Sequence, residues 1–152
     1  MNFSGEALLH APQQQVYDAL LDPKSLAHCL PGCEKLDEVA PDVFEAVVSL
    51  GIAAVKGKYN GRVSITERQP PNRYAMVVEG SSSTGTVKGT GTIALSEAVD
   101  GTKVDWNADV QIGGPIASVG QRLFGGITKL VAGDFFKCMD GQLAQKTAAQ
   151  EA

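Results

Sequence analysis

The stretch PIASVGQRLFGGITKLVAGDFFKCMDGQL, Pro115–Leu143, decides the fold of this chain. Its apolar residues recur at intervals of three and four, which predicts one long helix. Thirty helical residues span about 45 Å. The chain between Cys33 and Gly113 alternates instead between apolar and polar residues, which predicts strands and turns. A run of strands with a single long helix laid across it forms a half-open container, and we expect any function to lie in its interior.

The composition is that of an ordinary globular protein, with 43% hydrophobic and 20% charged residues. We expect one domain over residues 1–152. The net charge of −4 and the lack of a basic block predict no nucleic-acid partner. No segment is apolar for long enough to span a membrane, and no signal peptide is visible. The odd number of cysteines, Cys29, Cys33 and Cys138, predicts reduced thiols and a cytoplasmic location.

The elements before the long helix follow from the same patterns. Alternation over residues 2–9 predicts a first strand, and two proline-led segments predict short helices over Pro12–Leu21 and Pro23–Leu30. Strands are predicted over 34–39, 43–50, 57–67, 73–80, 86–95 and 103–112. This order predicts an α+β fold in which a curved antiparallel sheet of about seven strands is covered by the long helix.

The apolar stripe of the long helix admits two interpretations. It can simply pack against the sheet, or it can act as the lid of a hydrophobic cavity. Small inward residues favour a cavity, although Gly89 and Gly91 can equally mark bends of a curled sheet. Asp134 falls near the middle of the stripe, where it would be solvated at the cavity mouth, paired with a basic residue or bonded to a ligand. A kink at Gly133 would instead turn it outward.

The residues that we expect to contact a cavity ligand are almost all apolar, which suits binding better than catalysis. They are Phe44, Val48, Tyr59, Val63, Met76, Trp106, Ala108, Gly120, Phe124, Ile127, Val131 and Asp134. Tyr59 and Trp106 each offer one polar group. The residues His28, Cys29 and Cys33 are too sparse for a structural zinc site, so we expect no metal. No nucleophile elbow, phosphate loop or dinucleotide motif occurs, so we expect no catalytic residues.

Several short motifs together resemble the carbon monoxide dehydrogenase G-subunit family, within the helix-grip superfamily of START, Bet v 1 and polyketide-cyclase domains. They are Met1–Gly5, Ala11-Pro12, Val16–Leu20, Leu30–Cys33, Val55–Gly61, Gly120–Leu123 and Phe135-Phe136. The Pro-Gly-Cys and Lys-Gly-Lys motifs together are fairly specific, and the resemblance covers nearly the whole chain.

The resemblance implies a non-catalytic accessory protein. Its partner would be a molybdenum-hydroxylase-type dehydrogenase, and its cavity would hold a non-covalent quinone or lipid rather than a covalent cofactor. Family members are linked to recruiting that enzyme to the inner face of the cytoplasmic membrane, which implies peripheral membrane contact. Many members carry a C-terminal extension for this contact, and the polar run over residues 145–151 is not expected to act as one.

Two alternatives stay open, because a fold does not fix a function. One is an enzyme of the polyketide cyclase or dehydratase kind, which would need ionisable groups deep in the cavity, such as Asp134 beside a histidine. The other is a binding module, either a generic lipid-binding one or a plain interaction module whose interior is filled by its own side chains.

We predict that Gly125-Gly126 is a soft point of the long helix, because each glycine costs about 1 kcal/mol relative to alanine in a helix interior. Hydrogen exchange is expected to be faster at these amides than in the flanking turns. Uniform protection along the helix would contradict a soft point.

Overall fold

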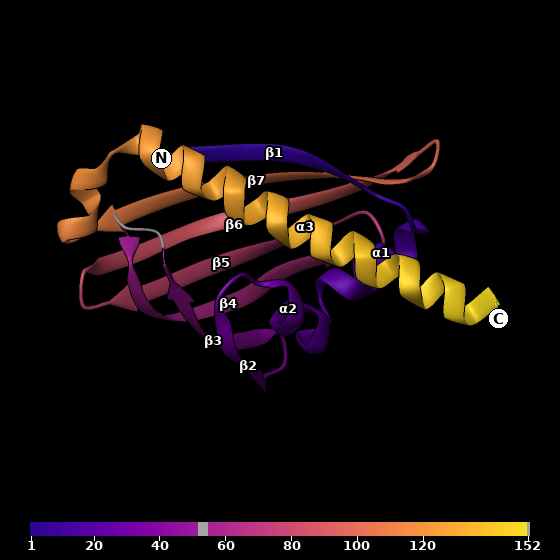
Figure 1. The fold of residues 1–152 in the computed structure, drawn as a ribbon, viewed down its shortest axis with the longest axis horizontal. Coiled ribbons are helices and arrows are strands. Elements are labelled where there is room, and N and C mark those ends of the chain that lie inside the picture. The colour runs from indigo at the N-terminus through magenta and orange to yellow at the C-terminus, as the bar shows by residue number, and fades with distance from the viewer. Residues whose placement is uncertain (52–54, 152) are drawn as a thin grey trace.

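Seven antiparallel strands form one curved sheet in the order β1-β7-β6-β5-β4-β3-β2 (Figure 1). The computed structural model describes the backbone of residues 1–51 and 55–151, and the side chains of 1–51 and 55–144. The strands are β1 (Asn2–Leu9), β2 (Cys33–Ala40), β3 (Val43–Leu50), β4 (Gly57–Gln69), β5 (Arg73–Ser82), β6 (Gly85–Ala98) and β7 (Gly101–Gly113). The predicted order of elements and the α+β class are confirmed.

Three helices lie on one side of the sheet. The long helix α3 (Gln121–Glu151) runs diagonally across it, and α1 (Gln13–Leu20) and α2 (Pro23–Cys29) contact the C-terminal part of α3 (Figure 1). Pro12 precedes the first turn of α1, where its missing N–H costs nothing. The side chain of Asp22 caps α2 by accepting from the Lys24 amide and the Ser25 hydroxyl.

The prediction of one unbroken helix from Pro115 is wrong. Residues Pro115–Val119 form a separate 3-10 helix, η2, and the chain then turns at Gly120 before α3 starts at Gln121. Gly120 has a φ of 87°, a left-handed conformation that no α-helix contains and that side chains with a Cβ disfavour. The helical period therefore runs through two elements, and Gly120 is the joint between them.

The hydrophobic core lies where α1 and α3 cross the sheet. Its fully buried side chains come from four elements and are Leu9, Val16, Val104 and Met139, with Leu143 only 2% exposed. A buried hydroxyl beside them, that of Thr102, donates to the Ala11 carbonyl over 2.8 Å. The polar group is thus satisfied, and the start of β7 is fixed to the start of α1.

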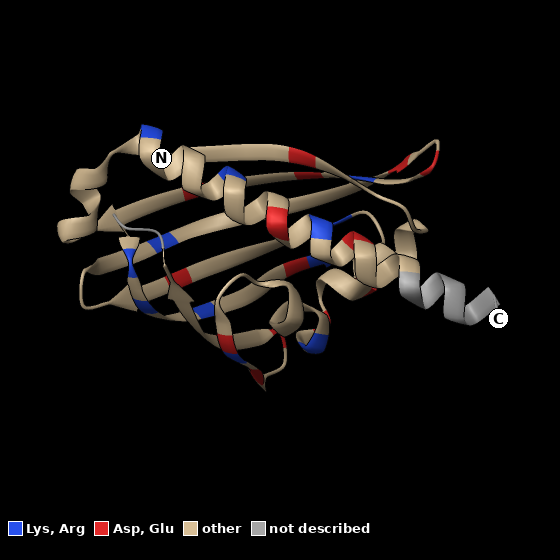
Figure 2. Cartoon of the chain, viewed as in Figure 1, with Lys and Arg blue, Asp and Glu red and all other residues tan. Residues whose placement is uncertain are grey.

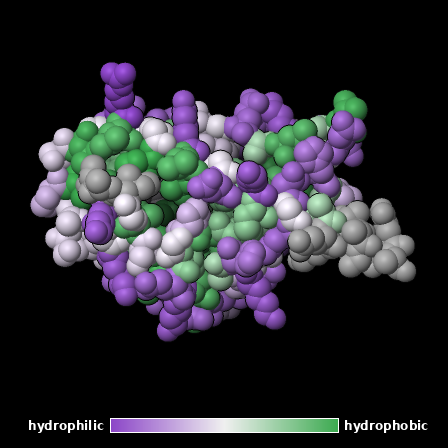
Figure 3. Space-filling view, viewed as in Figure 1, coloured by the Kyte–Doolittle hydropathy of each residue, from purple (hydrophilic) through white to green (hydrophobic). Residues whose placement is uncertain are grey.

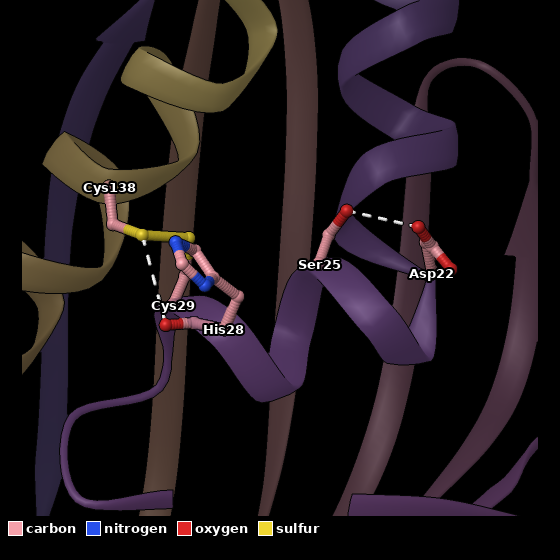
Figure 4. The surroundings of a disulfide bond; sticks show 5 residues. All are labelled: Asp22, Ser25, His28, Cys29 and Cys138. Atoms are coloured by element: carbon pink, nitrogen blue, oxygen red, sulfur yellow. Dashed lines mark hydrogen bonds between the residues drawn. A yellow bond between two sulfur atoms is a disulfide. The ribbon is translucent and has the colours of Figure 1, made fainter.

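A disulfide joins Cys29 of α2 to Cys138 of α3, so the prediction of reduced thiols is wrong (Figure 4). The two Cα atoms lie 5.4 Å apart although 109 positions separate them in sequence. The pairing depends on how α2 crosses α3, which neither the number of cysteines nor their spacing reveals. Cys33 is the free cysteine, and partial burial raises the pKa of its thiol.

Removing the disulfide should destabilise the fold. For Cys138→Ser we expect the free energy of unfolding to fall by about 2–4 kcal/mol, because the bridge no longer restricts the unfolded chain. Urea unfolding without reductant measures the change. Cys33→Ser is the matched control, since it removes a cysteine and keeps the bridge. Unchanged stability of Cys138→Ser, or three titratable thiols in the unreduced protein, would contradict the bridge.

Replacing either of two glycines of this region by alanine should change the stability of the fold, in opposite directions. Gly120→Ala forces a Cβ into a left-handed conformation and should cost about 1–2 kcal/mol. Gly126→Ala lies inside α3 with no atom within 4 Å of the new Cβ, and should stabilise by about 1 kcal/mol. Thermal unfolding of the two variants side by side gives the signs. Equal shifts would mean that Gly120 is not a conformational joint.

Candidate functional site

The face of the sheet beneath α3, the concave face, has a closed half and an open half. In the closed half, near α1, Tyr74, Ile93 and Leu95 are buried in the core against Phe136 and Met139 of α3. In the open half the inward-facing apolar side chains are only half-buried. These side chains are Phe3, Val48, Val63, Val78, Val87, Val110 and Ile112. Apolar surface between the sheet and α3 therefore remains accessible.

The open half lies under the first part of α3. A Cβ added at Gly125 would lie 3.9 Å from the ring of Phe3, which places this turn of the helix over β1. Hydrophobic surface gathers at the end of the molecule where α3 begins (Figure 3). Leu123, in the first turn of α3, is 44% exposed. Exposed apolar surface of this kind can mark a site that binds a ligand, a protein or a membrane.

The structure brings most of the predicted ligand contacts onto the concave face. Phe44 lies opposite Val63, and Val48 opposite Tyr59, across β3 and β4. Met76 and Ala108 flank the same residue of β6, Gly91. From α3, the half-buried side chains among the predicted contacts are Phe124, Ile127 and Val131. Their role as ligand contacts stays a prediction.

Three predicted contacts are placed differently. Gly120 belongs to the joint before α3, and a Cβ added there would have no atom within 4 Å. Asp134 is exposed, as it would be if the helix turned it outward. Trp106 lines a groove between β1 and α3 with a volume of about 420 Å³. It also packs against the core, so one side chain bounds both regions.

The glycines on the inward face of the sheet have different structural surroundings. A Cβ at Gly89 would lie 2.3 Å from the Asp109 carbonyl oxygen, so β7 approaches too closely for any side chain. A Cβ at Gly91 would lie 3.5 Å from Met76, an ordinary van der Waals contact, so the space beside Gly91 is bounded by Met76. Gly89 therefore fits a bend of the sheet better than a void. The sequence interpretation missed Gly61 and Gly80, which lie opposite each other and continue the inward alternation of β4 and β5.

The polar groups near the concave face are already engaged or neutral. The Tyr59 hydroxyl donates to the Val55 carbonyl over 2.8 Å. Burial raises the pKa of Tyr74, so its phenol stays protonated at neutral pH. His10 lies outside, where its backbone N–H and its Nδ1 contact the Asp140 carboxylate at 2.7 and 2.9 Å. Among the described residues, neither His10 nor His28 has a hydrogen bond or ion pair with Asp134, which was the arrangement that would favour an enzyme.

Other polar features lie on the outer face of the sheet. A depression of about 520 Å³ there is lined by charged side chains, with Arg62 bonded to Glu45 at 2.7 Å. A hydrogen bond from Lys58 lowers the pKa of Glu34 on the same surface. Over residues 1–51 and 55–144, no group of three or more His, Cys, Asp or Glu side chains is arranged to hold a metal ion. Within the same part of the chain, no helix has the length and apolar character needed to cross a membrane.

The fold is that of START-like proteins, in which a curved antiparallel sheet grips a long C-terminal helix. A START superfamily protein from Mycobacterium smegmatis superposes with a TM-score of 0.73 over 95% of this chain and 97% of that one, at 12% identity. A protein from Chromobacterium violaceum superposes with a TM-score of 0.70 over 93% and 96% of the two chains, at 19% identity. At these identities the likeness concerns the fold alone, and it confirms the helix-grip prediction.

The family is shown by sequence. Residues 5–144 match the family model of the carbon monoxide dehydrogenase G-subunit (CoxG), and the chain belongs to that family. A conserved protein from Geobacillus kaustophilus is 35% identical over 95% of this chain and 96% of its own, with a TM-score of 0.91. No curated protein matches the chain.

Proposed function

We propose that this chain is a non-catalytic accessory protein of a carbon monoxide dehydrogenase-type molybdenum hydroxylase. It binds an apolar, quinone- or lipid-like ligand between the open half of the concave face and α3. It also links the enzyme to the inner face of the cytoplasmic membrane.

The observation that carries this proposal is the difference between the two halves of the concave face. Val63 and Val110 face α3 as Tyr74 and Val104 do, yet the first two remain half-buried while the others are buried. Each Å² of apolar surface removed from water stabilises by about 25 cal/mol. An apolar ligand seated there gains this free energy with little rearrangement of the protein.

The partner and the non-catalytic role rest on the family. Its description names a component of carbon monoxide dehydrogenase, and such a component can supply a ligand without performing the reaction. A cyclase or dehydratase would need a positioned acid or base against the ligand. The side chains that could act as such an acid or base already have other partners. His10 contacts the Asp140 carboxylate, and the Tyr59 hydroxyl donates to a backbone carbonyl.

The membrane link would be peripheral. Leu123 and Leu130 of α3 are 44% and 56% exposed, and they lie seven residues apart on one side of the helix. Apolar side chains presented in this way can enter the headgroup region of a bilayer. The same surface would bring the ligand opening close to the lipid phase.

Native mass spectrometry of the chain purified from its own host tests the ligand. We expect a bound mass that organic extraction identifies as a quinone or lipid. Val131→Trp fills space between α3 and the sheet and should lower the occupied fraction several-fold. Lys24→Trp adds the same side chain at an exposed position of α2, outside both the ligand site and the membrane-contact surface, and should leave occupancy unchanged.

The outcomes separate the alternatives. A protein that is always empty contradicts the carrier role. A polar bound molecule that is chemically altered during incubation would favour the cyclase or dehydratase class instead. Equal loss in both tryptophan variants would place the ligand outside the open half.

A further inference from the structure

The groove between β1 and α3 is distinct from the open half of the concave face. Its floor is aromatic and apolar, formed by Trp106 of β7 and Phe136 of α3. The indole of Trp106 lies flat against Gly5, where an added Cβ would come within 2.6 Å of the ring. A side chain at this position of β1 would push the indole away, so the glycine at position 5 leaves the space that Trp106 occupies in the groove.

The charged side chains of this groove that have no hydrogen-bond or ion-pair partner among the described residues are both basic. Two carboxylates line it, but Glu6 pairs with Lys103 and Asp140 pairs with His10. Lys129 and Lys137 also line it, and neither has an ion pair or hydrogen bond with any other described residue. Among the same residues the Trp106 indole N–H also has no acceptor. The two ammonium groups thus lack a negative partner.

The two lysines flank a gap in the helix surface. Lys129, Gly133 and Lys137 are spaced four residues apart, so they follow one another along one face of α3, with about 12 Å between the outer two. Gly133 lines the groove, and a Cβ added there would have no atom within 4 Å. Side chains on a helix lean toward its N-terminus, so the ammonium group of Lys137 leans back toward this bare turn, and Lys129 borders the turn from its other side. Figure 2 shows basic positions on this part of α3, with acidic ones between and beyond them.

We infer that this groove binds a small amphipathic carboxylate. The carboxylate lies over Gly133 and accepts from Lys129 and Lys137, and the apolar body of the ligand stacks on Trp106. A volume of about 420 Å³ suits a molecule of medium chain length. This site does not depend on a quinone or lipid in the open half of the concave face.

Decanoate is a suitable probe, and the protein supplies its own reporter. Trp106 is the single tryptophan of the chain, so its fluorescence reports on this groove. Titration with decanoate below its micelle concentration should give a saturable change. Decanol, which has the same apolar chain and no charge, should bind about tenfold more weakly. Added salt should weaken decanoate binding, because both lysines are exposed.

Variants on α3 locate the site. Lys129→Gln with Lys137→Gln should weaken decanoate binding about tenfold. Lys24→Gln with Lys88→Gln changes the net charge equally at exposed positions outside the groove and should leave the affinity unchanged. Gly133→Leu fills the gap and should abolish binding, while its unfolding temperature stays equal or rises because leucine favours a helix.

Three results would overturn the inference. The first is equal affinity for decanoate and decanol, which would mean that the carboxylate is not recognised. The second is unchanged affinity in both the double-lysine variant and Gly133→Leu, which would place decanoate elsewhere, including the open half. The third is the absence of a saturable signal with the folded parent protein.

Discussion

The packing of the C-terminal part of α3 against the sheet is the contact on which the rest of the structure depends. Met139 and Leu143 are buried among Leu9, Val16 and Val104, which come from β1, α1 and β7. The contact closes the sheet at one end and fixes the direction in which α3 crosses it. Cys138, next to Met139, ties the same turn covalently to α2. Because its C-terminal part holds α3 in place, the first turns of α3 can cover the sheet without filling the space between helix and sheet.

That asymmetry explains where binding surfaces occur. The first turns of α3 include Gly125 and Gly126 and cover side chains of β1 and β7 that stay half-buried. Further along, α3 diverges from β1 and opens the groove that contains Trp106. Each surface has a different chemistry. The open half of the concave face is apolar, whereas the groove combines an aromatic floor with unpaired lysines. One helix thus borders two sites because its packing is uneven along its length.

The sequence predicted the strands well because their pattern is local. The alternation of Val104, Trp106 and Ala108 is a property of neighbouring residues, and it placed all three on the same face of β7. The predicted ligand contacts on β3 and β4 came together for the same reason. Periodicity failed at Gly120, because η2 continues the helical spacing while its axis does not continue into α3. For Asp134 it left several placements open, and the structure shows the exposed one, since a helical wheel cannot say how wide the covered stripe is.

By itself the sequence determined the order of the elements, the inward face of each strand and the family, because each of these is encoded in short segments. Only the tertiary structure decided which segments meet. It paired Cys29 with Cys138 and brought the His10 ring against the Asp140 carboxylate. It also placed Lys129 and Lys137 beside Trp106, without a side-chain partner among the described residues. These relations join residues far apart in the chain. Their physical origin is the angle at which α3 crosses the sheet, which no local pattern specifies.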